Sequence, residues 1–251
     1  MNKLPQITLA FWIMKICATT LGETAGDLLS MTLNVGYAVS SLLLFGCFAV
    51  ALVSQLRTKK YRPFLYWTVI LATSTAGTTM SDYMDRTLEL GYAKGTLILL
   101  SILAAIFAYW WMTEKSMSVE NIRTTKVEVL YWIAILFSNT LGTALGDYLA
   151  DDSGLGFMGG ATLIGTLLAI VAALAFYTKI SKVLLFWIAF VLTRPFGATF
   201  GDVLTKSPDK GGIGFGTVGS SAVLAALLIG TIIFTMRKAP VSQEPAIADL
   251  N

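Results

Sequence analysis

Histidine is absent from the 251 residues of this chain, and cysteine occurs only twice, at Cys17 and Cys47. The missing imidazoles exclude His-ligated metal sites, histidine proton relays and every catalytic arrangement that depends on histidine. The two cysteines lie in separate apolar stretches, so they indicate neither a disulfide framework nor a multi-thiolate metal site. The chain must therefore perform its function with other groups.

Charge is scarce as well. Charged residues make up 13% of the chain, against about 25% in soluble domains, while apolar residues make up 55%. About 20 apolar residues cross the hydrocarbon core of a bilayer as a helix. The sequence predicts an all-α membrane protein with eight transmembrane helices, at residues 7–29, 37–56, 64–84, 92–112, 127–149, 155–177, 183–204 and 214–236.

One motif recurs in the first, third, fifth and seventh of these segments. Its copies run from Thr20 to Asp27, Thr75 to Asp82, Thr140 to Asp147 and Pro195 to Asp202. A tryptophan stands fifteen residues before each final Asp, at Trp12, Trp67, Trp132 and Trp187. Repeats of this period indicate symmetry-related supersecondary units. Each unit contains two apolar segments, so we expect four two-helix hairpin repeats.

The first two motifs map onto the last two at an offset of 120 residues, which divides the chain into halves. We expect a first half at 1–112 with repeats 1 and 2, and a second half at 127–236 with repeats 3 and 4. A cytoplasmic linker at 113–126 joins them, and a flexible cytoplasmic tail follows at 237–251. Because each repeat has an even number of spans, the copies keep one orientation and the pseudo-symmetry axis should follow the membrane normal.

Lysine and arginine are distributed unequally between the two sides of the predicted bundle. Twelve lie on the side of the N-terminus, and the other side has Arg86, Lys94, Lys206 and Lys210. The positive-inside rule then places both termini in the cytoplasm. The net charge of +3 reflects this bias and indicates no nucleic-acid partner. The predicted partner is the lipid bilayer, and homo-oligomerisation remains open.

Four two-helix repeats, each with a Trp and a Gly-rich stretch that ends in Asp, resemble the bacterial membrane-protein family known for a four-fold repeat of unknown function. The resemblance covers about residues 7–236 and rests on the four tryptophans and the four motifs that end in Asp. It implies a multi-pass protein of the bacterial inner membrane. It implies no activity, so function has to be argued from the site.

Each motif contains two small residues four positions apart. The pairs are Gly22 and Gly26, Gly77 and Ser81, Gly142 and Gly146, and Gly197 and Gly201. Such pairs allow helix backbones to approach closely in lipid, where packing replaces the hydrophobic driving force. We expect all eight residues to lie at helix-packing contacts.

The four motif Asp residues are the candidate binding groups. Carboxylates inside a membrane are costly and usually mark an ion or proton path. The equal spacing favours a convergent ring of Asp27, Asp82, Asp147 and Asp202 in the outer part of the bundle. The alternative is that they cap hairpin turns in contact with water. Four other residues are expected at the surface: Asp85, Asp151, Asp152 and Asp209.

Three further charges break the symmetry of the repeats. Glu23 stands four residues before Asp27 and has no acidic equivalent in the other repeats. Lys15 stands eight residues before Glu23, and Arg194 stands eight before Asp202. We interpret the two cations as counter-ions of these carboxylates, with snorkelling or structural pairing as the alternative.

The candidate ligands are rich in oxygen. To the four Asp and Glu23 the motifs add the hydroxyls of Thr20, Thr24, Thr75, Thr78, Thr79, Thr140 and Thr143. Such sets suit hard cations, including Mg²⁺, Ca²⁺, Mn²⁺, Na⁺ and H⁺. The sequence therefore predicts a cation transporter, proton-coupled and without a cofactor, whose metal ligands are Asp27, Asp82, Asp147, Asp202 and Glu23.

Two other functions remain open. One is a non-transporting membrane scaffold or a small-solute carrier. The other is an intramembrane aspartyl enzyme, since two carboxylates could do acid/base work. A four-fold set is poor grounds for one asymmetric reactive pair, and no nucleophile with a base is evident, so we expect no enzyme.

Overall fold

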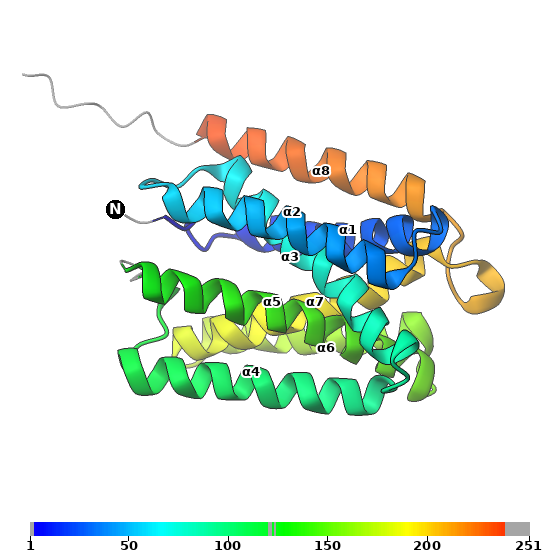
Figure 1. Cartoon of the computed structure of the whole chain (residues 1–251). Coiled ribbons are helices and arrows are strands. Elements are labelled where there is room, and N and C mark those ends of the chain that lie inside the picture. The colour runs from blue at the N-terminus through cyan, green and yellow to red at the C-terminus, as the bar shows by residue number, and fades with distance from the viewer. Residues whose placement is uncertain (1–2, 120–121, 123, 239–251) are drawn as a thin grey trace, which may run out of the picture.

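The computed structural model describes residues 3–119, 122 and 124–238. These residues form eight long helices and no strand, which confirms the predicted all-α fold (Figure 1). The helices are α1 (Leu9–Asp27), α2 (Tyr37–Arg57), α3 (Pro63–Asp82), α4 (Tyr92–Glu114), α5 (Thr125–Asp147), α6 (Gly156–Tyr177), α7 (Lys182–Thr205) and α8 (Thr217–Lys238). The predicted tail lies outside the described residues from position 239 onward, as do residues 120, 121 and 123 of the predicted linker.

Six of the described helical segments are long and apolar enough to cross a membrane. They are Tyr37–Arg57, Tyr92–Glu114, Thr125–Asp152, Gly156–Tyr177, Lys182–Thr205 and Thr217–Arg237. The chain is therefore a multi-pass membrane protein. The other two long helices, α1 and α3, carry many of the buried polar side chains.

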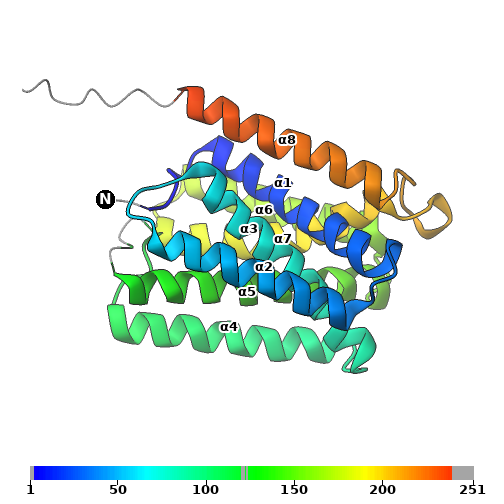
Figure 2. The ribbon, with the colours of Figure 1, turned by 45° about the horizontal axis from the view of Figure 1, so that its top comes forward.

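The helices form two layers. Helices α1, α3, α5 and α7 close into an inner ring, in which each helix packs against its two neighbours (Figures 1 and 2). The outer helices lie around this ring: α2 packs on α3, α4 on α5, α6 on α7, and α8 on α1. The second helix of each repeat thus covers the inner helix of the next repeat, and α8 returns to the first.

The side chains explain this division. Outer helices present large apolar side chains to the outside, among them Leu42, Val50 and Leu97, which are 76%, 71% and 63% exposed. Such a surface is stable against lipid and unstable in water. The inner helices instead bury threonine, serine and charged side chains among themselves. Most of the buried polar side chains of the described residues therefore lie in the inner ring, which the outer helices surround.

Tight turns join the two layers at the end of the bundle where the motifs finish. Gly36, Gly91, Gly156 and Gly214 have φ angles of 81°, 74°, 68° and 74°. Each lies at the start of an outer helix or within three residues of it. Only glycine adopts this region without strain.

Aromatic side chains close the ring at the opposite end, near the start of the described chain and the end of α8. Trp67 and Trp132 are 1% and 0% exposed, and the hydroxyls of Tyr66 and Tyr131 share a hydrogen bond of 2.7 Å. Trp187 packs beside them and donates through Nε1 to the Met117 carbonyl of the linker, at 3.0 Å. Three of the four motif tryptophans thus contribute to an aromatic floor, which we define as Tyr66, Trp67, Tyr131, Trp132 and Trp187.

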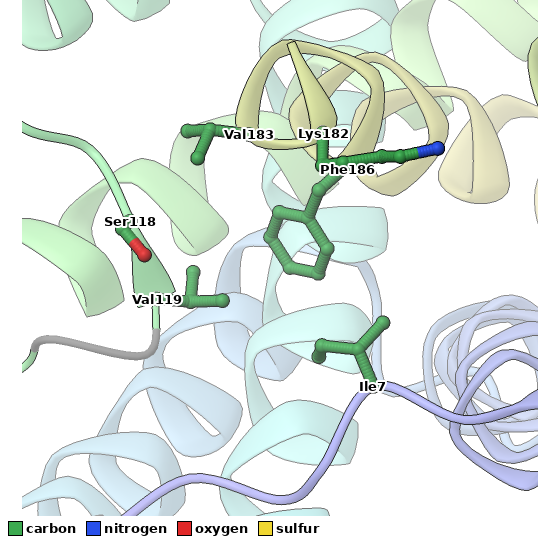
Figure 3. Close-up of a pocket in the computed structure, with 6 residues that line it drawn as sticks. All are labelled: Ile7, Ser118, Val119, Lys182, Val183 and Phe186. Atoms are coloured by element: carbon green, nitrogen blue, oxygen red, sulfur yellow. The ribbon is translucent and has the colours of Figure 1, made fainter. Parts of the chain in front are cut away.

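A small hollow lies beside this floor, where α7 begins (Figure 3). It is lined by Ile7, Ser118, Val119, Lys182, Val183 and Phe186. The Phe186 ring lies between Val119 and Ile7, and the Lys182 amine points away from them. The lining is mainly apolar, and it brings no carboxylate to the hollow.

Candidate cation site

The four motif Asp residues end the four inner helices on the side away from the aromatic floor. Asp27, Asp82, Asp147 and Asp202 are only 2%, 2%, 3% and 4% exposed. None of them lies on the exposed surface of a hairpin. The ring of inner helices therefore brings four carboxylates into one buried layer.

A widened turn follows three of these residues directly. The π-helical segments η1 (Leu28–Thr32), η2 (Tyr83–Thr87) and η4 (Tyr148–Asp152) begin one residue after Asp27, Asp82 and Asp147. In the fourth repeat α7 continues to Thr205, and a short 3₁₀ turn, η5 (Pro208–Lys210), follows. Single π turns inside α-helices occur frequently at functional sites.

Arg86 bridges two of the carboxylates. Its Nε lies 3.0 Å from Asp82 Oδ1 on its own repeat, and its Nη2 lies 3.4 Å from Asp147 Oδ2 on the next inner helix. The side chain is 33% exposed, so the guanidinium reaches the buried layer from the end of the inner ring that lies opposite the aromatic floor. We call this end the mouth of the ring. Arg86 joins α3 to α5 at this level.

Lys206 makes the matching bridge between α7 and α1. Its Nζ lies 3.0 Å from Asp202 Oδ1 and 2.9 Å from Asp27 Oδ2. Burial opposes the charged form of Lys206, but the carboxylates of Asp202 and Asp27 outweigh this effect and raise its pKa above the ordinary value. The ammonium is therefore charged at neutral pH.

The sequence pattern predicts Arg86 and Lys206 only in the outer loops, and no role in the site was expected for them. A signal was present, because each stands four residues after a motif Asp and the two positions are 120 residues apart, the same offset that relates the halves. Four residues is one helical turn, which brings side chains to the same face.

Glu23 and Arg194 form a buried ion pair below this layer. Arg194 Nη2 lies 2.9 Å from Glu23 Oε2 and donates to Thr143 Oγ1 at 2.6 Å. The same guanidinium contacts the Thr78 hydroxyl and the backbone carbonyl of Thr19. One side chain of α7, 0% exposed, therefore contacts all three other inner helices. Arg194 pairs with Glu23 and not with Asp202, the partner expected from spacing.

Lys15 has no carboxylate partner among the described residues. Its Nζ lies 3.5 Å from Asn139 Oδ1 and 3.9 Å from the centre of the Phe190 ring. Asn139 in turn donates to Thr73 Oγ1 at 2.8 Å. The side chain is fully buried, so it does not snorkel, and the ion pair expected with Glu23 is not made.

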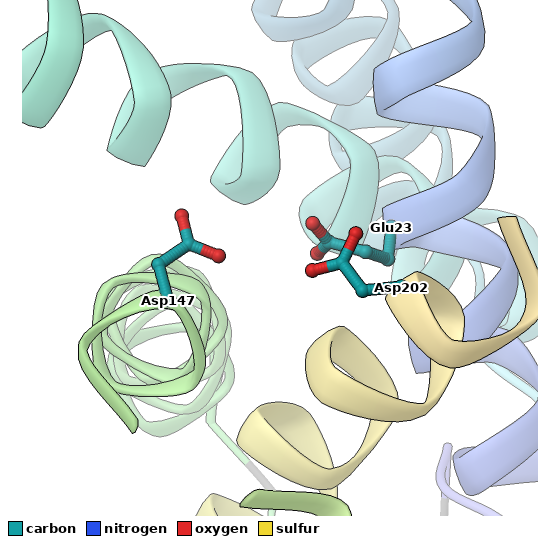
Figure 4. Close-up of side chains that lie close together, drawn as sticks. All are labelled: Glu23, Asp147 and Asp202. Carbon is teal, nitrogen blue, oxygen red and sulfur yellow. The ribbon is translucent and has the colours of Figure 1, made fainter. Parts of the chain in front are cut away.

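Three carboxylates approach closely enough to share one cation. One oxygen from each of Glu23, Asp147 and Asp202 lies within 4.8 Å of the others (Figure 4). Asp147 and Asp202 point toward one another, with Glu23 beside Asp202. Asp147 Oδ1 and Glu23 Oε1 have no hydrogen-bond or ion-pair partner among the described residues. Two buried carboxylates thus keep an acceptor oxygen available.

Most of the predicted hydroxyl ligands are engaged elsewhere. Thr20, Thr24, Thr75, Thr79 and Thr140 donate to backbone carbonyls of their own helices. Thr78 and Thr143 instead contact the Arg194 guanidinium. The oxygen groups of the layer are therefore mainly carboxylates.

One of the four expected surface carboxylates is buried. Asp85 is 6% exposed and accepts a hydrogen bond of 3.3 Å from Ser81 Oγ through Oδ2. Gly95 at the start of α4 leaves the room for it, since a methyl group there would lie 2.0 Å from Asp85 Oδ1. The expectation for Asp85 is wrong because η2 turns its side chain toward α4. Asp151, Asp152 and Asp209 are exposed.

The small residues of the motifs lie where inner helices cross. A methyl group added to Gly22 would lie 2.1 Å from Ser74 Oγ, and one added to Gly142 would lie 2.3 Å from Arg194 Cγ. Three more would approach the next helix closely as well: Gly77, Gly146 and Gly197. Gly26 and Gly201 face Thr78 and Glu23 in the same way, while Ser81 contacts Asp85. The glycines permit the close ring that brings the carboxylates together.

The repeats of the chain match a known family model. The model is described as a Repeat of Unknown Function (DUF347), and it matches residues 10–61, 65–116, 130–181 and 185–239. The four matches cover most of the chain and coincide with the four motif-bearing units. No curated protein and no solved structure matches the chain.

Proposed function

Since the chain belongs to the DUF347 repeat family, whose description names no activity, we propose a function from the site itself: the protein transports a hard cation across the membrane. The observation that carries this proposal is the buried layer of Asp27, Asp82, Asp147 and Asp202 with Glu23 beneath it. Buried carboxylates in a membrane protein are costly and typically mark ion paths.

The charge balance of this layer supports a cation. Five carboxylates meet three cationic side chains, Arg86, Lys206 and Arg194, which leaves a net charge of −2 when all are ionised. Carboxylates this close repel by about 4 kcal/mol per pair at 4 Å and an effective dielectric near 20. Binding a cation or protons relieves this repulsion. Oxygen ligands favour Mg²⁺, Ca²⁺ or Mn²⁺ over softer metals.

Coupled transport is favoured over free conduction. Arg194 contacts all three neighbouring inner helices, and the aromatic floor closes the far end of the ring. A cation that enters from the mouth of the ring meets the positive charge of Arg194 below the carboxylate layer. Beyond it lies the packed aromatic floor. Passage requires these contacts to rearrange, and protonation of the carboxylates as the cation leaves provides the coupling to proton exchange.

We further propose that α1 and α3 cross the membrane beside the six apolar segments. Both belong to the inner ring, and 19 and 20 residues are about 28 and 30 Å long. Their polar groups face the ring and not lipid. Eight spans then place both ends of the bundle on the same side, and the Lys/Arg bias makes that side the cytoplasm, with the repeats related about the membrane normal.

This topology predicts the location of a reporter. A phosphatase or fluorescent reporter fused after Arg237 is expected to report the cytoplasm, and one inserted in the outer turn after Asp209 the opposite side. The measurement is reporter activity in whole bacterial cells. A periplasmic signal from the Arg237 fusion would contradict the eight-span arrangement.

Transport is tested in liposomes. Asp147→Asn and Asp202→Asn are expected to lower Mn²⁺ or Mg²⁺ flux at least about tenfold, because each removes a charged ligand worth about 1.5 kcal/mol or more. Asp151→Asn is the matched control, since Asp151 is exposed and lies four residues after Asp147. Flux equal to the control in folded variants of both residues would favour the scaffold or small-solute carrier.

A further inference from the structure

The layer of four Asp residues has four helix interfaces, and the chain itself bridges two of them. Arg86 bridges Asp82 to Asp147 between α3 and α5, and Lys206 bridges Asp202 to Asp27 between α7 and α1. Both cations stand four residues after the Asp of their own helix and reach forward to the next inner helix. Two positions of the ring are thus occupied by tethered positive charges.

The other two interfaces lack such a residue. The position four residues after Asp27 is Met31, and the position four residues after Asp147 is Asp151. Neither supplies a cation, so among the described residues no cationic side chain bridges Asp27 to Asp82 or Asp147 to Asp202. The motif occurs four times, but in the part of the chain that the structure describes a bridging cation occurs at only two of the four helix interfaces. The bridging charges therefore repeat twice and not four times.

From this arrangement we propose that one divalent cation binds at the α5–α7 interface, held by Asp147, Asp202 and Glu23, in the place that Arg86 and Lys206 occupy at their interfaces. This assignment rests on the proposed transport function and specifies its binding site. It separates Asp147 and Asp202, which face one another and would both contact the bound cation, from Asp27 and Asp82, which among the described residues form ion pairs only with Lys206 and Arg86 respectively.

Two observations distinguish the α5–α7 interface from the interface between α1 and α3. Glu23 joins Asp147 and Asp202 with oxygens within 4.8 Å, and no second such group occurs among the described residues. Asp202 Oδ1 is buried and accepts no hydrogen bond, and its one contact is the ion pair with Lys206 at 3.0 Å, whereas neither Asp27 nor Asp82 has such an oxygen in the described part of the chain. Buried acceptors without donors are rare unless a ligand satisfies them.

The charge of the ligand follows from the same count. The net charge of −2 that remains after Arg86, Lys206 and Arg194 equals the charge of one divalent ion. A monovalent ion would leave the layer anionic, whereas two divalent ions would overcharge it. The charges of Arg86, Lys206 and Arg194 thus favour the binding of one divalent ion in the carboxylate layer.

The test is to fill the free position with a tethered amine. Asp151→Lys places an ammonium four residues after Asp147, which repeats the relation of Lys206 to Asp202, so it should reach Asp202. The probe is MnCl₂ or MgCl₂ added to the detergent-solubilised full chain, and the readout is the rise in melting temperature. We expect the half-maximal concentration to rise at least about tenfold in Asp151→Lys, equivalent to about 1.4 kcal/mol.

Three variants separate this effect from other causes. Met31→Lys places the same amine at the α1–α3 interface and should keep the wild-type concentration dependence. Asp151→Asn removes the original charge without adding an amine and should keep it as well. Arg86→Gln releases Asp147 from the guanidinium and should lower the half-maximal concentration, in the direction opposite to a folding defect.

The outcomes distinguish the inference from the function on which it rests. Wild-type chain that no divalent cation stabilises would overturn the proposed cation transport. Wild-type stabilisation that Asp147→Asn abolishes and Asp151→Lys leaves unchanged would overturn the assignment to α5–α7 and leave transport standing. Equal loss in Asp151→Lys and Met31→Lys would also overturn it, because the two interfaces would then be equivalent.

Discussion

Replacing Arg194 with leucine is expected to cause the largest loss of stability of any single substitution in the inner ring. The change leaves Glu23 as a buried carboxylate without its cation and removes contacts to three helices. Removal of one partner from a buried pair costs about 3–5 kcal/mol. The measurement is thermal unfolding in detergent, where Arg194→Leu should melt well below the wild type.

The control is Arg57→Leu, an exposed arginine at the end of α2, which should change stability by less than about 0.5 kcal/mol. The double variant Glu23→Leu with Arg194→Leu should recover part of the loss, because no uncompensated charge then remains. If the single and double variants melt together, Glu23 is already neutral in the folded protein and the pair contributes little.

Enlarging Gly142 is expected to have the second-largest effect. Its methylene faces Arg194 and Pro195, and an added methyl group would lie 2.3 Å from Arg194 Cγ and 2.9 Å from Pro195 Cδ. The Arg194 side chain cannot yield freely, since Glu23 holds its far end. Gly142→Leu should therefore destabilise the protein by about 1–3 kcal/mol or more and displace the guanidinium from the ring.

A glycine of the outer layer provides the comparison. Gly46 lies in α2 with no atom within 4 Å of an added methyl group, so Gly46→Leu should be neutral or stabilising in a helix. Both variants are measured by melting temperature and by divalent-dependent stabilisation. If Gly142→Leu has the melting temperature and the divalent-dependent stabilisation of the wild type, the helices α5 and α7 are packed less tightly at Gly142 than the contacts indicate.

Periodicity in the sequence was sufficient to predict the helices and the burial of the motif Asp residues. Equal spacing from Trp to Asp places the same groups at the same level on each inner helix, and the structure has the four carboxylates at the end opposite the aromatic floor. The glycine pairs could be read in the same way, because a four-residue step keeps both on one helix face.

The spacing of residues within one helix could not predict which side chains meet across different helices. An eight-residue step suggested that Lys15 pairs with Glu23, but eight residues rotate a helix side chain by about 80°, so the two do not share a face. The true partner of Glu23 comes from α7. Likewise, charge counting assigned Lys206 to a loop, because spacing within one helix does not reveal which neighbour lies across the ring.

Each outer helix covers the inner helix of the next repeat, and this arrangement has a consequence for biosynthesis. Helix α1 is made first, yet its outer face is covered by α8, which is made last; Ser221 Oγ lies 2.9 Å from Thr24 Oγ1, and Cys17 donates to the Leu224 carbonyl. Its inner face likewise waits for α7, which supplies Arg194 to Glu23. Because α7 and α8 both follow α1 in the chain, α1 gains these partners of its inner and outer faces only after six further helices have been synthesised.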